Sequence, residues 1–438
     1  MRDVQGRSAG WAVSGTGGEL PSDVRRLLLE RATSTDDVVR GRVAGIIGRV
    51  RRDGDDALRA MALEFDGVAL ESLEVPRAQW TRALDAIDSP LRRALERAVR
   101  NIETAHAAFR PVAQEIETEP GVIVGRRPDP LGRVGVYAPG GRAVYPSSVL
   151  MGAVPARVAS VGEIVLCSPP QADGAPAGVV LAAAALAGVD RVFALGGAGA
   201  IAAMAFGTAS VPRVDRIVGP GNAYVAEAKL QVSGSVAIDS PAGPSELLVI
   251  CDESADPELV ARELVAQAEH DPDAFVLAIA IGPNVAQAIE DALLRAADAT
   301  PRAAIVRASL GARGGVIAAD DTGQAVTLAN EIAAEHVLLA CAEPTVVLAS
   351  LRGAGTVFVG STSSVAFGDY MTGANHVLPT GGLARCYSGL STLDFIRWTT
   401  YQRVDRVAAE RLSRDVGILA DSEGLPGHAA AARAWSRG

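Results

Sequence analysis

The sequence predicts an α/β protein with two successive parallel sheets, a helical N-terminal region and a helical C-terminal tail. From residue 134 onward, short β-branched runs alternate with Ala-rich helical stretches, which is typical of parallel βαβ units. Aromatic residues make up only 4% of the chain and hydrophobic residues 49%, so the cores must consist mainly of Ala, Val, Leu and Ile. The predicted strands form two series: 134–137, 164–167, 192–195 and 217–218, then 247–251, 275–280, 315–318, 337–339 and 357–359.

The chain is long enough for several domains. A chain of 438 residues is longer than a domain with a single hydrophobic core usually is. We expect a flexible arm rich in Gly, Ser and Thr, a helical region that packs with the second sheet domain, two α/β domains and a tail. In chain order these predicted parts are residues 1–20, 21–133, 134–245, 246–385 and 386–438. His106, within the helical region, is interpreted as a surface histidine.

Composition excludes several classes of partner. A formal net charge of −10 argues against nucleic acid. No apolar core follows a basic N-terminal start, and the longest apolar run, near 179–189, is too short to span a membrane. Lys229 is the only lysine, so Schiff-base chemistry has one candidate at most. The four cysteines form no Cys-x-x-Cys pair; three lie in or beside apolar strand-like runs and are interpreted as buried reduced thiols, whereas Cys386 lies in a polar turn. We expect a cytoplasmic protein.

Four Gly/Pro-rich turns follow predicted strands of the first series or lead into the second. They begin at Tyr137, Gly196, Val218 and Ser240, and the third ends at Asn222. The second turn satisfies a loose dinucleotide fingerprint, but no acidic residue ends a strand about 20 residues later, as ribose binding requires. Since open α/β sheets bind ligands at the carboxyl ends of their strands, the turns predict a crevice with backbone walls.

A Gln-x-x-His pair ends a predicted helix just before Pro272. Gln267 and His270 lie three residues apart and therefore project from one helix face. Such a pair is most often a cap or a core-edge contact. It also offers an amide oxygen and an imidazole nitrogen, which are two possible metal ligands.

Two further clusters carry ionisable side chains. Glu335 and His336 follow an amphipathic helix, where a histidine is favoured by the helix dipole, but the two also suit a general base and a water activator. Asp369 and His376 lie in a Gly-, Asn- and Thr-rich segment with no periodicity, and such a loop favours a site over a spacer. Glu423 and His428 lie in the tail, where the sequence pattern is similar.

Taken together, these motifs resemble the histidinol dehydrogenase family from about residue 35 to the end of the chain. Their number and order make the resemblance specific. The motifs are Tyr137-Ala-Pro-Gly-Gly, Val218-Gly-Pro-Gly-Asn222, Ala242-Gly-Pro-Ser-Glu246, Gln267-Ala-Glu-His-Asp271, Glu335-His336, Gly368-Asp-Tyr370, Asn375-His-x-Leu-Pro379 and His428.

The resemblance implies roles for particular residues. Glu335 and His336 would carry the acid–base chemistry, and Tyr137 and Asn222 would contact NAD. The zinc ligands that it implies are Gln267, His270, Asp369 and His428. The substrate contacts that it implies are Ser245, His376 and Glu423, together with the zinc ligands and His336.

The resemblance also implies a fold and a reaction. The fold has two incomplete Rossmann-like sheets and forms a homodimer in which the tail of 386–438 crosses to the partner. The reaction is the oxidation of L-histidinol to L-histidine by two NAD, with zinc mainly positioning the substrate. Gly199 departs from the family, which usually has Gln there, near NAD. A dehydrogenase of another small alcohol, a zinc hydrolase and a non-catalytic binder remain alternative hypotheses.

Overall fold

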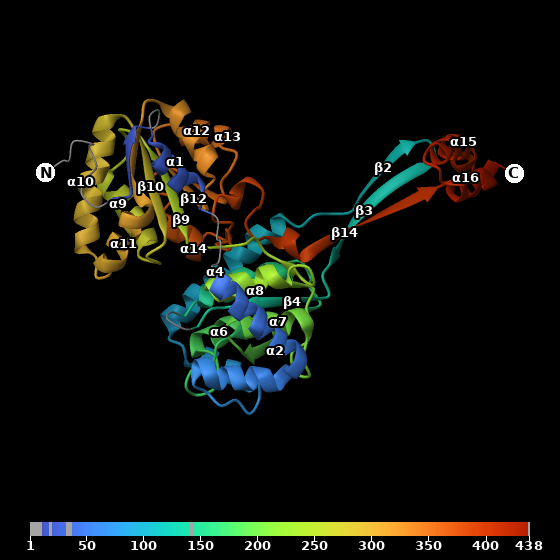
Figure 1. The fold of residues 1–438 in the computed structure, drawn as a ribbon, viewed down its shortest axis with the longest axis horizontal. Helices are drawn as coiled ribbons and strands as arrows, with labels where there is room; N and C mark the ends of the chain where they lie inside the picture. The colour runs from blue at the N-terminus through green and yellow to red at the C-terminus, as the bar shows by residue number, and fades with distance from the viewer. Residues whose placement is uncertain (1–10, 17–19, 32–36, 141–143, 437–438) are drawn as a thin grey trace.

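The computed structural model describes residues 11–16, 20–31, 37–140 and 144–436. It confirms the α/β prediction, because two lobes are each built around a parallel sheet. Figure 1 shows the two lobes side by side and a long arm that carries the C-terminal helices away from both. No helix in the described part of the chain is long and apolar enough to cross a membrane.

The first lobe contains a five-stranded parallel sheet in the order β6-β5-β4-β7-β8. Its strands are β4 (Arg133–Tyr137), β5 (Glu163–Ser168), β6 (Arg191–Ala194), β7 (Arg216–Val218) and β8 (Ala237–Ile238). The order reverses between β4 and β7, so a topological switch point, where open α/β sheets bind ligands, lies beyond Tyr137 and Val218.

The second lobe repeats this order around six parallel strands, β1-β11-β10-β9-β12-β13. The strands are β1 (Val13–Thr16), β9 (Glu246–Cys251), β10 (Phe275–Ile281), β11 (Gly314–Ala319), β12 (His336–Ala340) and β13 (Thr356–Val359). The prediction of a flexible arm at 1–20 is therefore wrong for the segment that forms β1. Val13 is fully buried and pairs with Gly315, so the sheet fixes this segment. Residues 1–10 and 17–19 lie outside the described residues.

Helices cover both faces of the first sheet in two layers. α3 packs on α6, α4 packs on α5, and α2 packs on α7 and α8. Their bounds are α2 (Asp37–Met61), α3 (Arg77–Ala86), α4 (Ser89–Ala108), α5 (Pro146–Val158), α6 (Gly178–Ala187), α7 (Gly197–Phe206) and α8 (Ala223–Val232), with a π-helical turn at Ala62–Asp66 after α2. The helical region predicted to pack with the second sheet therefore packs mostly on the first, where Ile47, Leu58 and Trp80 join its core.

His106, near the end of α4, is also buried rather than exposed. Its side chain has a relative exposure of only 2%, and neither ring nitrogen has a hydrogen-bond partner. Burial lowers the pKa of His106 to about 4, so the ring is neutral at physiological pH.

The second sheet buries both of its faces, as its continuous apolar strands require. In β9, Leu247 and Val249 face α9, α10 and α11, whereas Leu248 and Ile250 face α1, α12 and α13. These helices are α1 (Ser22–Leu29), α9 (Pro257–Ala268), α10 (Pro283–Ala299), α11 (Ala303–Arg313), α12 (Thr322–Ile332) and α13 (Pro344–Ser350).

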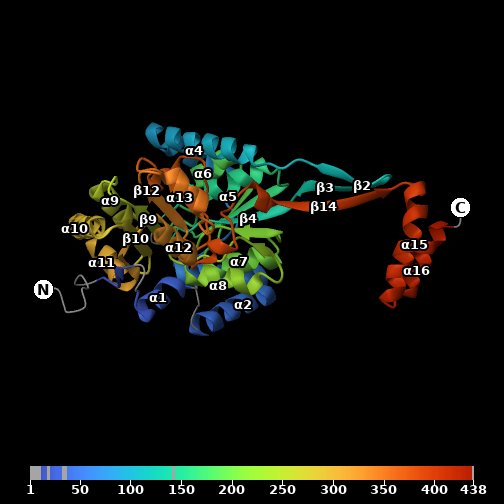
Figure 2. The ribbon, with the colours of Figure 1, turned by 90° about the horizontal axis from the view of Figure 1, so that it is seen from above.

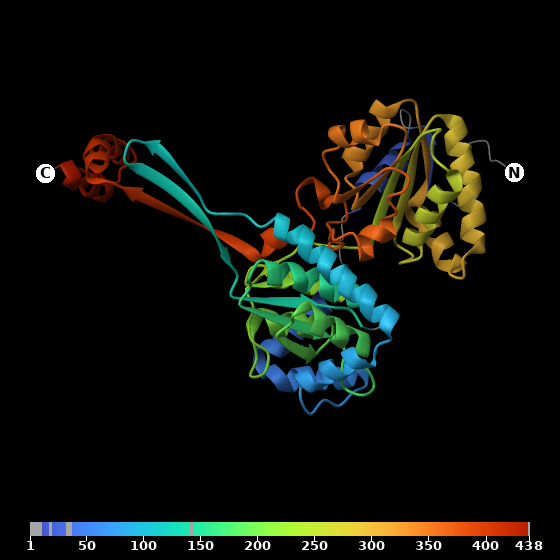
Figure 3. The same ribbon diagram turned by 180° about the vertical axis from the view of Figure 1, so that it is seen from behind.

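A third, antiparallel sheet forms the arm. It has the order β14-β3-β2 and consists of β2 (Gln114–Glu119), β3 (Val122–Pro130) and β14 (Ile396–Val404). The tail was predicted to be helical, and α15 (Arg406–Ser422) and α16 (Pro426–Arg433) confirm this. The prediction missed β14, whose nine residues pair with β3 from before the first sheet. Figures 2 and 3 show the arm extending from the lobes and ending in the packed pair α15 and α16.

Candidate functional site

A single cavity of about 2580 Å³ brings together the predicted site residues of both lobes. In the first lobe it lies at the carboxyl ends of β4 and β7, as predicted from the sheet class. In the second lobe, however, the cavity residues from Ser245 to Glu335 lie before β9, β10 and β12, at the amino edge of the sheet, and His336 begins β12. Asp369 and His376 come after β13. The predicted residues that line the cavity are Tyr137, Asn222, Ser245, Gln267, His270, Glu335, His336, Asp369 and His376.

His336, the first residue of β12, has a ring whose two nitrogens differ. Nδ1 lies 2.9 Å from the backbone carbonyl oxygen of Glu246, and a carbonyl can only accept, so Nδ1 carries the hydrogen. Nε2 is buried without a hydrogen-bond partner and lies 3.5 Å from Asp369 Oδ1, beyond hydrogen-bonding distance for a side chain. When the ring is neutral, the Glu246 carbonyl keeps the hydrogen on Nδ1, so Nε2 is the atom that can accept a proton.

Glu335 and Glu246 exchange hydrogen bonds between their backbones and carboxylates. The Glu246 N–H donates to Glu335 Oε2 at 2.8 Å, and the Glu335 N–H donates to Glu246 Oε2 at 3.2 Å. Burial raises the pKa of Glu335, against the lowering effect of His336 and of the Glu246 N–H. Burial by itself would lower the pKa of His336, but the carboxylates of Glu335 and Asp369 outweigh it and raise that pKa to about 10.

Asp369 lies on the short helix α14 (Val365–Tyr370), between the two lobes. Burial would raise the pKa of Asp369, but the neighbouring histidines, His336 above all, lower it. His376 donates from Nδ1 to the Asp369 carbonyl at 2.9 Å, which again leaves its second ring nitrogen free. Both residues of this predicted pair therefore lie beside His336.

Gln267 lies in the last turn of α9, which ends at Ala268, and His270 lies in the turn just beyond it, so the two do not share a helix face as predicted, although both line the cavity. Gln267 is buried, with 3% exposure, whereas His270 is exposed beside the cavity. No group of three His, Cys, Asp or Glu side chains among the described residues is arranged to hold a metal ion. Two of the predicted zinc ligands, His270 and Asp369, have side chains of these types and line the cavity. Gln267 lines it with an amide, and His428 does not line it.

Glu423 and His428 lie far from this cavity within the same chain. Both are exposed, Glu423 just after α15 and His428 on α16. Figure 1 shows these helices at the far end of the arm. The structure of one chain therefore does not bring the tail residues together with the other predicted ligands.

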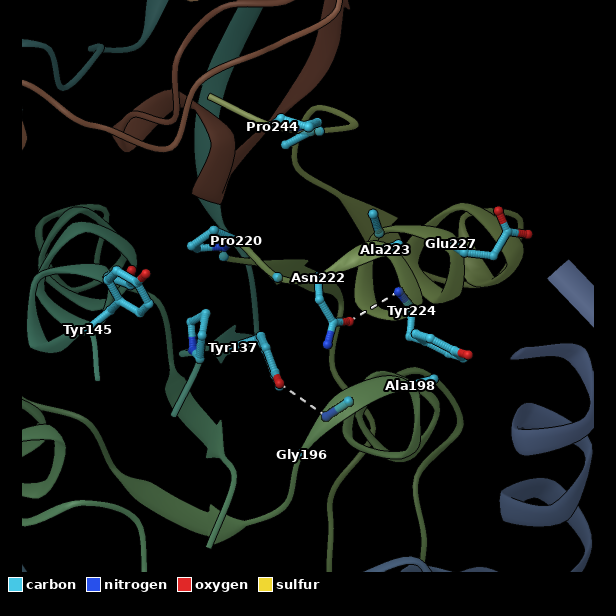
Figure 4. Close-up of a pocket in the computed structure, with 18 of the residues that line it drawn as sticks. Tyr137, Tyr145, Gly196, Ala198, Pro220, Asn222, Ala223, Tyr224, Glu227 and Pro244 are labelled. Atoms are coloured by element: carbon cyan, nitrogen blue, oxygen red, sulfur yellow. Dashed lines mark hydrogen bonds between the residues drawn. The ribbon is translucent and has the colours of Figure 1, made fainter. Parts of the chain in front are cut away.

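The cofactor residues predicted in the first lobe hold its turns in place (Figure 4). The Tyr137 hydroxyl accepts the Gly197 N–H at 3.0 Å, at the start of α7, and burial raises the pKa of Tyr137 to about 12. The Asn222 Oδ1 caps α8 by accepting the N–H groups of Tyr224 and Val225 at 3.1 and 3.2 Å. The amide nitrogen of Asn222 is then the group left to face a ligand.

A buried ion pair supports the turn that carries Asn222. Lys229 Nζ donates to the Gly219 carbonyl at 3.0 Å and pairs with Asp239, whose Oδ2 accepts the Gly219 N–H at 2.7 Å. Gly219 has φ +119°, and a Cβ there would lie 2.1 Å from the Tyr137 carbonyl oxygen, so only glycine fits. The sequence identified Lys229 only as a candidate for Schiff-base chemistry, and it missed Asp239.

Gly199, the departure from the family pattern, lies in the first turn of α7. A Cβ at this position would lie 3.1 Å from the Met61 sulfur and 3.5 Å from Leu58 Cδ2. A larger side chain therefore requires Met61 to move by a few tenths of an ångström.

Sequence reasoning also missed the support of the Glu335–His336 pair. Glu246 belongs to a motif that carried the resemblance, yet nothing in the sequence gave it a role. Arg31, whose guanidinium donates to both carboxylate oxygens of Glu246, was also missed, because it lies about 300 residues before the pair and has no local pattern.

Comparisons with known proteins agree with this geometry. The family model described as histidinol dehydrogenase matches residues 29–435. The histidinol dehydrogenase of Natronomonas pharaonis is 48% identical over 412 residues, which cover 94% of this chain and 96% of that protein. The enzyme of Methanosarcina mazei is 44% identical over 408 residues, covering 93% and 94% of the two chains.

A solved structure extends the agreement to the fold. The crystal structure of histidinol dehydrogenase from Elizabethkingia anophelis superposes with a TM-score of 0.93 at 33% identity, covering 98% of this chain and 99% of that one. The predicted resemblance is confirmed, and the chain belongs to the histidinol dehydrogenase family.

Proposed function

We propose that this protein oxidises L-histidinol through L-histidinal to L-histidine, with NAD as the oxidant, as the last steps of histidine biosynthesis. The observation that carries the proposal is the His336 ring, whose Nδ1 is held by a carbonyl and whose Nε2 is free. This ring lines the same cavity as the Gly/Pro turns of the first sheet, where a dinucleotide is expected.

Each oxidation releases one hydride. In the first, Nε2 of His336 accepts the hydroxyl proton while the hydride of the same carbon passes to NAD, which leaves the aldehyde and NADH. In the second, Glu335 accepts a proton from water as the water oxygen adds to the aldehyde carbon. The hydride of this hydrate passes to a second NAD, its remaining hydroxyl proton is lost, and the carboxylate forms. The aldehyde must stay bound in the cavity between the two oxidations.

The charge around His336 constrains the first step. Glu335 and Asp369 raise the pKa of His336, so a cation bound beside Asp369 would lower that pKa and favour the neutral ring that accepts the proton. When bound, zinc would hold the amine and imidazole nitrogens of the substrate and offset the charge of Asp369.

The donor set fits zinc only if the partner completes it. Gln267, His270 and Asp369 supply an amide oxygen, an imidazole and a carboxylate around one cavity. His428 is the fourth proposed ligand, and its exposure at the end of the arm supports a position in the partner's cavity. Ser245, His376 and Glu423 are proposed to contact the substrate.

The exposed apolar side chains of the tail also support a homodimer. Ile418 and Leu419 on α15 and Trp435 beyond α16 have exposures of 53%, 66% and 60%, which a helix pair standing alone in water does not favour. A partner lobe would cover them. A cytoplasmic location is part of the same proposal, since the cysteines of the described chain are all free.

Product stoichiometry tests the reaction. Purified protein with limiting L-histidinol should form two NADH per substrate, and a chelator should abolish this until zinc is restored. One NADH with free aldehyde accumulating would refute the two-step reaction. Amide hydrolysis without NADH would indicate a zinc hydrolase, and binding without turnover would indicate a non-catalytic binder.

Complementation between two inactive variants tests the crossed tail. His336→Asn and His428→Ala would be co-expressed or refolded together. If the tail serves the partner, one cavity of each heterodimer has a normal body and a normal tail, so about a quarter of wild-type activity returns on random mixing. If His428 acts within its own chain, every cavity keeps one lesion, and the mixture stays as inactive as its parents.

A further inference from the structure

We propose that Arg31 is a positioning residue that acts through Glu246 on both members of the Glu335–His336 pair. Arg31 follows α1 and has an exposure of only 3%. Its Nε donates to Glu246 Oε1 at 2.9 Å and its Nη2 to Glu246 Oε2 at 3.3 Å. The planar fork of the guanidinium thus engages both carboxylate oxygens, which fixes the orientation of Glu246.

The guanidinium is itself held from several sides. Nη2 also donates to the Ile332 carbonyl at 2.8 Å, and Nη1 donates to the Leu28 carbonyl. The Arg31 Cζ lies 4.5 Å from the centre of the Phe275 ring, over its face. Arg31 therefore ties α1, the end of α12 and the amino edge of the sheet to one buried carboxylate.

Glu246 passes this placement on to the proposed catalytic pair. Its backbone N–H fixes the Glu335 carboxylate, and its backbone carbonyl fixes the His336 ring. Its carboxylate, held by Arg31, accepts the Glu335 N–H and the Gly381 N–H. By holding the Glu246 side chain, Arg31 thus holds the residue whose backbone contacts both Glu335 and His336.

The need for Arg31 follows from burial. The carboxylates of Glu246 and Glu335 are both buried, and each accepts the backbone N–H of the other residue. The two negative charges therefore lie close together and repel one another. The guanidinium offsets the Glu246 charge and permits both carboxylates to stay in this arrangement. A lysine at this position keeps the positive charge but cannot donate to both carboxylate oxygens as the guanidinium does. Arg31→Lys therefore tests the orientation of Glu246 separately from its charge neutralisation.

The proposal rests on the proposed function, because it assigns Arg31 to the same reaction. The test is Arg31→Lys, with Arg25→Lys as the matched control. Arg25 also joins α1 to α12, through Glu331, but both side chains of that pair are well exposed. Histidinol and histidinal are supplied separately, and kcat and the KM for NAD are measured for each.

We expect Arg31→Lys to lower kcat for both steps by about 100-fold, the scale of an ångström-sized misplacement of a catalytic group. The KM for NAD should not change, since the cofactor turns lie in the other lobe, and Arg25→Lys should behave like wild type. In a Glu335→Gln background, the loss of histidinal oxidation caused by Arg31→Lys should shrink, because the group it positions is already disabled.

Three outcomes would overturn the proposal: unchanged kcat in folded Arg31→Lys, a loss of equal size in the Glu335→Gln background, or equal losses in Arg25→Lys. If Arg31→Lys does not fold, Glu246→Gln takes its place with the same expectations and the same refutations. Full histidinal oxidation by Glu335→Gln alone would refute the proposed role of Glu335. Arg31 is then judged on histidinol oxidation alone, where a kcat loss supports its role and no loss overturns it.

Discussion

Replacing Lys229 by Met should destabilise the first lobe and loosen its cofactor turn. The side chains of Lys229 and Asp239 are only 5% and 3% exposed, so the substitution leaves a buried carboxylate without its cation. Breaking a buried ion pair in this way costs about 3–5 kcal/mol. The Gly219 carbonyl loses its donor at the same time, so the turn that ends at Asn222 becomes less ordered.

Urea unfolding measures this cost, and NAD kinetics measure its consequence. Lys229→Met should lower the free energy of unfolding by about 3–5 kcal/mol and raise the KM for NAD. The double variant Lys229→Met/Asp239→Asn removes both charges and should recover most of the stability, since Asn can still accept from Gly219. An exposed pair gives the control, because Arg25→Met should cost only about 0.2–1 kcal/mol. If Lys229→Met costs no more than this control, the buried pair does not hold the turn and the reasoning fails.

Three further substitutions test other parts of the structure. Glu335→Gln should slow histidinal oxidation by roughly 10²–10⁴, and histidinol oxidation less, because only the second step needs an activated water; equal losses in the two separately measured steps would contradict this role. His106→Leu should make the free energy of unfolding less dependent on pH. The pKa of His106 in the folded protein, about 4, lies below its value in the unfolded chain, so the unfolded chain binds a proton first as the pH falls. In unfolding curves measured in parallel, the wild type should lose about 2 kcal/mol more than the variant between pH 7.5 and 5. Gly199→Gln should lower the KM for NAD by about 2–10-fold, the worth of one hydrogen bond, if the flexible end of Met61 moves aside. A higher KM would show that Met61 does not yield.

The sequence by itself predicted the strands of the two parallel sheets and identified the family. The nine strands predicted in two series are all present, because β-branched runs between Ala-rich helices leave no other regular structure that buries both faces. The sequence also placed Gln267 in the last turn of a helix that ends before Pro272, because the apolar periodicity stops there. The motifs identified the family because each combines residues that ordinary loops rarely need.

Only the tertiary structure decided how distant segments meet. Residues 13–16 join the second sheet as β1, and β14 pairs with β3 across about 270 residues of sequence, neither of which a local pattern encodes. The use of the amino edge of the second sheet depends on how the two lobes face each other. Arg31, Glu246 and Glu335 form one network because β9 and β12 are neighbours in the sheet and the end of α1 lies against their amino ends. Burial then gives these contacts their strength, since a charge removed from water must be paired, and the sequence alone does not show which charges those are.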